Sequence, residues 1–165
     1  KFKEDILKYF GKEYKDKTLI ELGCCQGTTT RVYAECFGKV IGVDKDKWNI
    51  DQAKNNCKDV SNVEFYQQDL YNEEWKFPKA DVVVIDAGHT YEHIIRDVPR
   101  VIEYFNNPII ILDDYGNPNQ SIRRGIDELV NENILSIKHK IGSNSGFKTA
   151  TGLVFNDIEG IICKT

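Results

Sequence analysis

Two apolar stretches of the sequence end in carboxylate residues. Asp86 follows the stretch 81–85, and Asp113 and Asp114 follow the stretch 108–112. If these stretches are neighbouring strands of a parallel sheet, their carboxyl ends meet at one edge, and the like charges gathered there repel one another. A divalent cation removes this repulsion, and oxygen ligands with open coordination positions suit Mg²⁺. These residues therefore indicate a site for a divalent cation at the edge of a sheet.

A histidine stands beside these carboxylates. His89 lies about one helical turn beyond Asp86, and its ordinary pKa near neutrality would let it take a proton as a general base. The alternative is that His89 caps or packs against the helix that follows. His93, on that helix, is expected to be structural, and His139 is expected to lie on a solvated face.

A glycine-containing loop follows the stretch 18–22. Glu21 leads into Gly23 and Gly27, and glycine just past the carboxyl end of a buried strand lets backbone N–H groups approach a ligand that a Cβ would exclude. The spacing differs from the dinucleotide fingerprint, and a P-loop is absent. A turn without a ligand is the alternative interpretation, so the loop needs support from the residues that follow it.

Strands and helices alternate along the chain. Continuous apolar runs are typical of buried parallel strands, and apolar residues recurring at i, i+3 and i+7 indicate helices. The alternation predicts a parallel sheet covered on both faces. Pro99 should break or kink the helix around residues 94–105 near Asp97, because proline lacks an N–H. The expected strands are 18–22, 39–43, 63–66, 81–85, 108–112, 135–141 and 160–163; the other expected helices are 2–10, 28–37, 46–57 and 122–130, and residues 71–79 should form a helical turn and a loop.

Acidic residues stand at the ends of the parallel strands or just past them. Asp44 closes the second strand, where its carboxylate can accept both hydroxyl protons of a ribose held by the glycine loop. Asp69, after the third strand, is placed to accept from an adenine amine. The alternative is that Asp44 caps the next helix and Asp69 caps a turn. A row of such residues along one edge favours ligand binding.

The order E-x-G-x-x-x-G, followed by these carboxylates, resembles the pattern of class I S-adenosylmethionine (SAM) dependent methyltransferases over nearly the whole chain. The family's usual loop is acidic-x-G-x-G-x-G, and Cys25 replaces its middle glycine. The resemblance implies a Rossmann-like α/β sandwich, with a mostly parallel seven-stranded sheet, a C-terminal antiparallel strand and helices on both faces. It also implies SAM as cofactor, since acidic surroundings suit a positive sulfonium. The residues expected to bind SAM are Glu21, Gly23, Cys24, Gln26, Gly27, Thr28, Asp44, Lys45, Gln68 and Asp69.

The acidic pair and the sequence Asp-x-x-His-x-Tyr that begins at Asp86 look closer to one branch, the metal-dependent macrocin and aminocoumarin sugar O-methyltransferases. By this resemblance Asp86, Asp113 and Asp114 hold Mg²⁺, which binds vicinal hydroxyls of a sugar, glycan or other small diol and lowers the pKa of the one that is methylated. Asp86 and His89 are the expected catalytic residues. Two alternatives stay open: a metal-free SAM methyltransferase with His89 as base, and a SAM-binding domain without transferase activity of its own.

Composition limits the partners. The chain has 165 residues, of which 41% are hydrophobic, and a net charge of −4, which suits one domain over residues 1–165 and gives no broad basic surface for nucleic acid. No apolar run approaches the roughly 18 residues that span a bilayer, and the first residues are not a secretory signal, so we expect a cytoplasmic protein that binds no membrane. The five cysteines are expected to be free thiols. A chain that begins at Lys1 and contains no Met is consistent with a domain cut from a longer polypeptide, whose other domains would be partners; the oligomeric state stays open.

The sequence has no long insertion of the kind that would form a lid over an acceptor. The acceptor pocket is therefore expected to be formed by the N-terminal helix, residues 71–79 and the loop 143–151. Arg123 and Arg124 either line this pocket or are surface charges, and the second interpretation is favoured.

Overall fold

The structure is a computed structural model that describes residues 1–117, 121–143, 147–148, 154–155 and 158–165. The strands of its main sheet are β1 (Thr18–Leu22), β2 (Lys39–Asp44), β3 (Val63–Gln67), β4 (Val82–Ile85), β5 (Ile109–Leu112), β6 (Ser136–Ile141) and β9 (Gly160–Lys164). The helices are α1 (Phe2–Phe10), α2 (Thr28–Tyr33), α3 (Lys47–Asn56), α4 (Tyr91–Phe105) and α5 (Ser121–Asn131). A separate two-stranded sheet pairs β7 (Phe147–Lys148) with β8 (Val154–Phe155).

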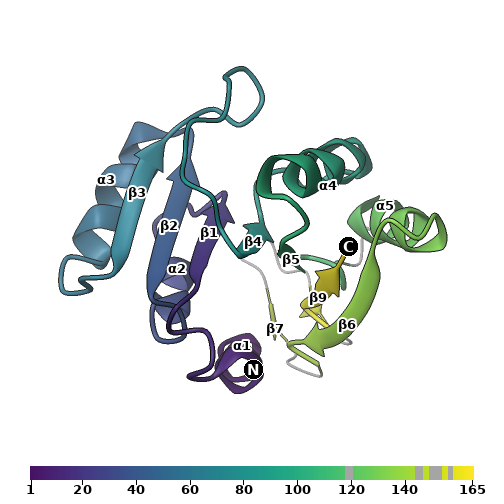
Figure 1. Ribbon diagram of the computed structural model, residues 1–165, viewed down its shortest axis with the longest axis horizontal. Helices are drawn as coiled ribbons and strands as arrows, with labels where there is room; N and C mark the ends of the chain where they lie inside the picture. The colour runs from purple at the N-terminus through teal and green to yellow at the C-terminus, as the bar shows by residue number, and fades with distance from the viewer. Residues whose placement is uncertain (118–120, 144–146, 149–153, 156–157) are drawn as a thin grey trace.

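The main sheet has the strand order β3-β2-β1-β4-β5-β9-β6 (Figure 1). The strands from β1 to β5 are parallel, and β9 lies antiparallel between β5 and β6. The predicted Rossmann-like sandwich, with its C-terminal antiparallel strand, is confirmed.

Alternate residues of the central strands enter two different apolar cores. Leu19 and Val40 pack with residues of α1 and α2, whereas Ile20 and Ile41 share a core with residues of α4 and α5. In Figure 1 α4 and α5 lie side by side above one half of the sheet, and α1 lies below it. Burial of both faces explains why these strands read as continuous apolar runs, and it gives the strand ends a firm support.

The strand order places a crevice at the carboxyl end of β1. The chain leaves β1 toward β2 on one side, while β4 pairs with β1 on the other, so the loops after β1 and β4 diverge, and such a switch point is where open α/β sheets bind ligands. Leu22 of β1 is level with Ile85 of β4, which is level with Leu112 of β5. The residues that follow these three therefore emerge at one edge.

One expectation about the helices is wrong. Pro99 lies inside α4, which continues from Tyr91 to Phe105 as one helix. The packing of its buried residues Ile94, Val98, Val101 and Phe105 against the sheet offsets the backbone hydrogen bond that proline cannot make.

Residues 71–79 begin in a turn and continue as a loop, which forms the crossover from β3 to β4. Aromatic side chains of this loop, Trp75 and Phe77, are buried against Phe105 of α4.

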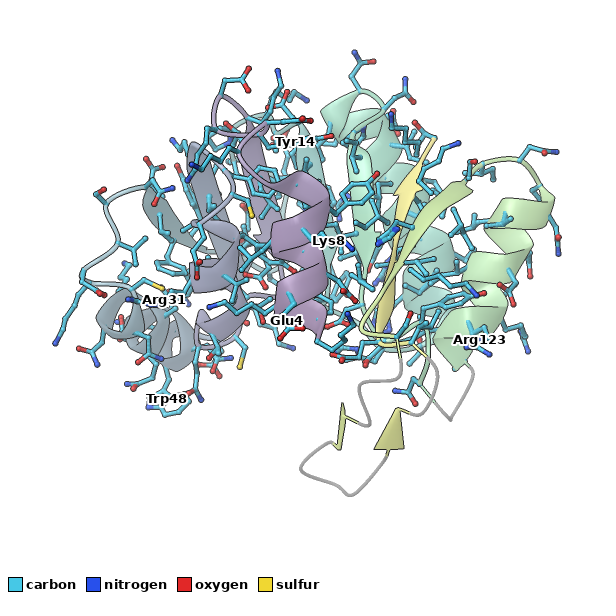
Figure 2. All side chains as sticks on the ribbon, turned by 90° about the horizontal axis from the view of Figure 1, so that it is seen from below. Glu4, Lys8, Tyr14, Arg31, Trp48 and Arg123 are labelled. Atoms are coloured by element: carbon cyan, nitrogen blue, oxygen red, sulfur yellow. The ribbon has the colours of Figure 1, made fainter. Side chains whose placement is uncertain are left out.

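The remaining general features concern cysteines and surface residues. All five cysteines lie in described parts of the chain and are free, as predicted. Across the described residues, no helix is long and apolar enough to cross a bilayer. Figure 2 shows Trp48, whose side chain projects from the start of α3 and is 59% exposed.

Candidate active site

The loop between β1 and α2 has left-handed backbone conformations at the expected glycines and at the cysteine between them. The φ angles are 95° at Gly23, 46° at Cys25 and 75° at Gly27. A Cβ at Gly23 would lie 2.3 Å from the backbone oxygen of Asp86, so only glycine permits the ends of β1 and β4 to approach this closely. Cys25 adopts a conformation that favours glycine, and its N–H donates to Asp44 Oδ2 at 3.0 Å.

The carboxylate of Asp44 joins this loop to the start of α3. Its Oδ1 accepts from the backbone N–H of Asp46 at 2.9 Å and from Asn49 Nδ2 at 3.3 Å, while Oδ2 accepts from Cys25. The cap of α3 is Asp46, which accepts from Trp48 N–H and Asn49 N–H, so Asp44 is not the helix cap. Asp44 is therefore positioned in advance at the end of β2.

A cavity of about 240 Å³ opens beside Asp44 at the carboxyl ends of β1 to β4. Five of the residues expected to bind the cofactor line it: Gly23, Asp44, Lys45, Gln68 and Asp69. Five lining residues were missed, namely Asp46, Asn49, Leu70, Tyr71 and Ala87. The signal for Asn49 was its place in the first turn of α3, four residues after a lining lysine, and the signal for Tyr71 was its place two residues after Asp69.

Asp69 and Gln68 also hold the loop that follows β3. Asp69 Oδ1 accepts from the backbone N–H groups of Tyr71, at 2.8 Å, and Asn72, at 3.3 Å, and these hydrogen bonds lower the pKa of its carboxyl. Gln68 Nε2 donates to the Glu74 carbonyl. The turn-cap alternative for Asp69 is thus what the structure shows, in a residue that also faces the cavity.

The other residues expected to bind the cofactor do not line this cavity. Glu21 is only 1% exposed, shares the face of β1 that carries Leu19, and accepts a hydrogen bond from Thr30 Oγ1 of α2. Burial raises the pKa of Glu21 to about 8. The remaining four lie around the turn into α2: Cys24 is buried, Gln26 O accepts from Asn56 Nδ2, Gly27 packs on Ala53 and Phe65, and Thr28 is exposed at the first position of the helix.

The second group of predicted residues meets at the ends of β4 and β5. His89 Nδ1 lies 2.8 Å from Asp114 Oδ2, and His89 Nε2 lies 3.9 Å from Asp86 Oδ1. Asp113 Oδ1 accepts from the backbone N–H of Asp114 at 2.9 Å. The His89 side chain is 51% exposed, against 28% for Asp86 and 24% for Asp114, so the imidazole forms the outer part of the group.

The surroundings of these residues favour bound protons. Burial and then the charges of Asp113 and Glu21 raise the pKa of Asp86 well above its ordinary value. Burial and the neighbouring Asp114 charge raise the pKa of Asp113 to about 7. The hydrogen bond with Asp114 raises the pKa of His89. A carboxylate facing Nδ1 places that nitrogen's proton toward Asp114 and leaves Nε2 as the acceptor when the ring is neutral.

This arrangement does not fit the predicted magnesium site. Within the residues that the structure describes, no group of three His, Cys, Asp or Glu side chains is placed to hold a metal ion. Asp114 has a left-handed φ of 58°, and its carboxylate pairs with His89. The pair with His89 thus balances part of the negative charge for which the sequence suggested a cation.

The other candidates fall outside this group. His93 Nδ1 lies 2.9 Å from Thr90 Oγ1 and its ring packs on Tyr71, which agrees with a structural residue. His139 is exposed, with its ring beside that of Tyr9.

Each of the two arginines contacts a tyrosine. Arg123 donates through Nε to the Tyr115 carbonyl, and Arg124 lies over the Tyr91 ring. Of the expected acceptor loop 143–151, only Ser143 and the backbone of β7 are described; the rest lies outside the described residues.

Comparisons with known proteins agree with this geometry. Residues 19–106, more than half of the chain, match a family described as "Methyltransferase domain". An uncharacterized RNA methyltransferase of Clostridium tetani is 31% identical over 113 residues, which cover 64% of this chain and 24% of that protein. The 23S rRNA (uracil(1939)-C(5))-methyltransferase RlmD of Edwardsiella ictaluri is 29% identical over 111 residues, covering 60% and 25%. The match thus spans about a quarter of the length of these relatives.

Solved structures share the fold at low identity. The O-methyltransferase of Bacillus cereus in complex with SAH has a TM-score of 0.65 at 18% identity, covering 99% of this chain and 78% of that one. The N-methyltransferase NodS of Bradyrhizobium japonicum has a TM-score of 0.72 at 12% identity, covering 99% and 93%. One of these proteins is named an O-methyltransferase and the other an N-methyltransferase, and at these identities the similarity shows the fold alone.

Proposed function

Because the chain belongs to the methyltransferase domain family, we propose that it transfers the methyl group of SAM to a hydroxyl oxygen of a small acceptor such as a sugar, glycan or other vicinal diol. The observation that carries this proposal is the His89–Asp114 pair, 2.8 Å apart, beside Asp86. SAM supplies a methyl group on a positive sulfur that leaves as a neutral thioether, so the acceptor has only its hydroxyl proton to lose.

His89 is the residue that takes this proton. Asp114 holds its Nδ1 and stabilises the imidazolium that forms, while Nε2, on the side of Asp86, is the nitrogen that accepts the proton. Asp86, at 3.9 Å from Nε2, is close enough to bind a hydroxyl group that lies between the two side chains. This orientation suits an oxygen acceptor, because a hydroxyl must lose its proton as the new bond forms.

The cavity beside β1 to β4 suits the adenosine part of SAM. Asp44 offers acceptor oxygens for ribose hydroxyls, Asp69 offers them for an adenine amine, and Leu70, Tyr71 and Ala87 supply apolar walls. The lining includes a single lysine, Lys45, and two more carboxylates than cations, so it suits a cationic donor better than a polyphosphate.

The mechanism assigns no step to a metal, because among the residues that the structure describes the carboxylates are not placed to hold one. His89, held by Asp114, takes the hydroxyl proton instead. Transfer should accordingly continue when a chelator is present in excess.

RNA is the second candidate acceptor, and the two curated relatives favour it. Against it stand the net charge of −4 and the concentration of carboxylates around His89, which repel a phosphate backbone. A neutral hydroxylated molecule meets no such repulsion.

The test measures S-adenosylhomocysteine released from SAM with a panel of sugars and small diols, with RNA, and with no acceptor, each in excess chelator. We expect release above the no-acceptor level with members of the hydroxylated panel. Release with RNA alone would replace the proposed acceptor. SAM binding without release from any acceptor would support a SAM-binding domain without transferase activity, and release only after magnesium is added would restore the metal site.

A further inference from the structure

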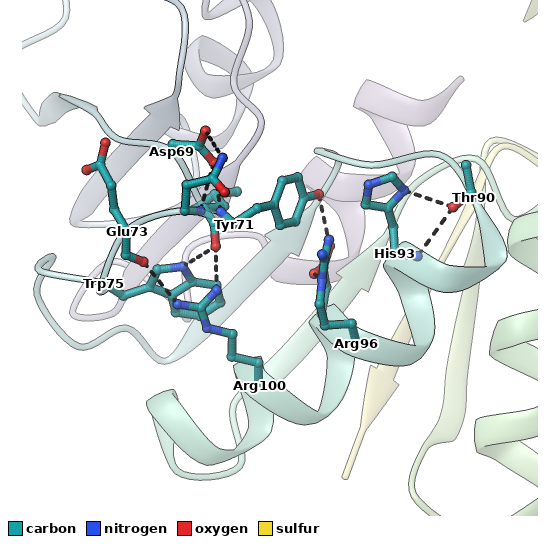
Figure 3. A network of polar contacts seen from close by, with 11 residues as sticks. Asp69, Tyr71, Glu73, Trp75, Thr90, His93, Arg96 and Arg100 are labelled. Atoms are coloured by element: carbon teal, nitrogen blue, oxygen red, sulfur yellow. Dashed lines mark hydrogen bonds and ion pairs between the residues drawn. The ribbon is translucent and has the colours of Figure 1, made fainter.

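Tyr71 lies between the two parts of the candidate site, the cavity beside Asp44 and the group formed by Asp86, His89 and Asp114. It lines the cavity beside Asp44, and its side chain reaches toward α4 (Figure 3). The Tyr71 hydroxyl donates to Asp97 Oδ2 at 3.1 Å, and its ring lies between His93, with ring centroids 5.2 Å apart, and Arg96, whose guanidinium carbon is 3.9 Å from the ring centroid. Tyr71 is thus fixed from three directions.

The carboxylate that anchors Tyr71 lies in the interior. Asp97 is only 4% exposed, and its second oxygen accepts from Arg96 Nε at 3.1 Å. Burial and the Asp97 charge raise the pKa of Tyr71 to about 12, so its hydroxyl keeps the proton that it donates. A buried charge is retained only where it is paired, and here the pairing fixes one side chain of the cavity to α4.

The loop that carries the proposed base packs against the same tyrosine. A Cβ at Gly88 would lie 2.3 Å from Cγ of His93 and 2.7 Å from the Tyr71 hydroxyl oxygen. Gly88 stands between Asp86 and His89, so the backbone that presents both residues rests directly on Tyr71 and His93. The glycine is required at this position by that close approach.

The loop of Tyr71 is itself held to α4 at a second point. Arg100 stacks on Trp75, with its guanidinium carbon 4.0 Å from the ring centroid, and donates to the carbonyls of Leu70 and Glu73. Arg96 and Arg100 therefore hold residues 70–75 against one face of α4, as Figure 3 shows. A loop held at two points keeps a fixed distance between the cavity that it lines and α4, the helix that begins just after His89.

We propose that Tyr71 is a positioning residue of the methyl transfer, which rests on the proposed function: anchored by Asp97, it holds the donor cavity and the loop of Asp86 and His89 at a fixed separation. Removing its hydroxyl leaves the cavity wall in place but releases the anchor. SAM then binds as before and His89 ionises as before, but the two are no longer aligned with each other.

The test compares Tyr71→Phe and Asp97→Asn with Tyr66→Phe, a matched control whose hydroxyl contacts Glu64 on the edge strand β3. We expect Tyr71→Phe to lower kcat roughly tenfold to a hundredfold, the size of effect that a small misplacement causes. The Kd for SAM, measured by calorimetry, should change by less than about threefold, since the ring still lines the cavity. Tyr71→Ala removes the wall and should weaken SAM binding whether or not an acceptor is known.

A second variant guards against a folding defect. Gly88→Ala keeps Tyr71 and Asp97 but inserts a methyl group where the two rings approach, so it should lower kcat in the same way while circular dichroism shows a folded protein. If Tyr71→Phe and Gly88→Ala lower only the melting temperature and keep the kcat of Tyr66→Phe, the positioning role is wrong. The proposed function fails separately, if wild-type protein releases no S-adenosylhomocysteine with any acceptor.

Discussion

The two halves of the site, at the ends of β1 to β3 and at the ends of β4 and β5, use the same side chain in opposite surroundings. In the first half, Asp69 accepts from two backbone N–H groups, which lower the pKa of its carboxyl. In the second half, burial and the charges of neighbouring carboxylates raise the pKa values of Asp86 and Asp113. The neighbours of a carboxylate thus decide whether it presents a fixed negative charge or more readily binds a proton.

The largest expected effect is that of removing the base from the second half. His89→Ala should reduce turnover by roughly 10²–10⁴-fold, the usual contribution of a positioned general base, with SAM affinity unchanged. Steady-state release of S-adenosylhomocysteine and calorimetry measure the two quantities. His139→Ala, an exposed histidine beside Tyr9, is the control. If His89→Ala turned over as fast as the wild type, His89 would not be the general base.

The reverse pattern is expected in the first half. Asp44→Ala should weaken SAM binding by about 1–3 kcal/mol, because ribose hydroxyls lose their partner and Cys25 N–H loses its acceptor. Asp51→Ala, which removes an exposed carboxylate paired with Lys47 on the same helix, should leave the affinity unchanged. Titration calorimetry of the three proteins decides this, and equal affinities would show that the cavity is not the donor site.

Stability should also depend on pH through Glu21, which lies beneath both halves. Its pKa is about 8 in the folded protein against 4.5 ordinarily, so the folded state binds more protons between these values and loses stability as pH rises through that window. The loss should be up to about 1.4 kcal/mol per pH unit. Asp113, with a pKa of about 7, adds a loss of the same sign.

Glu21→Gln provides the comparison for this expectation. It should flatten the decline in unfolding free energy, measured in urea at several pH values between the two pKa limits. A decline as steep as that of the wild type would mean that Glu21 is not the group that loses its proton.

The smallest expected effect is a displacement of a pH profile. His89 must be neutral to take a proton, and Asp114 raises its pKa, so kcat/KM should rise with pH with a midpoint above the ordinary histidine value of 6.5. Asp114→Asn should move the midpoint to lower pH, because the imidazolium loses its anionic partner. A midpoint that stays in place, or moves to higher pH, would show that Asp114 does not raise the pKa of His89.

Much of the fold could be predicted from the sequence because buried parallel strands have a simple signature. Runs such as Val82–Ile85 and Ile109–Leu112 are apolar at every position, since both faces of the sheet are covered. Their common edge follows from their direction, which is why His89 and the neighbouring aspartates were expected together.

What the sequence did not show depends on tertiary contacts and side-chain direction. Pro99 suggested a broken helix, but burial of the α4 stripe outweighs one missing hydrogen bond. Glu21 alternates with Leu22 and so faces α2 instead of the cavity. The turn of Asp114 toward His89 follows from a left-handed backbone at a residue other than glycine, which no pattern of residue types indicates.

The most direct measurement is the NMR spectrum of the product formed from SAM with an isotopically labelled methyl group, in excess chelator, with the hydroxylated acceptor that gives the most S-adenosylhomocysteine. We expect the label in a methoxy group, formed by wild-type protein and lost in His89→Ala. A label on carbon or nitrogen, or no product until magnesium is supplied, would contradict it.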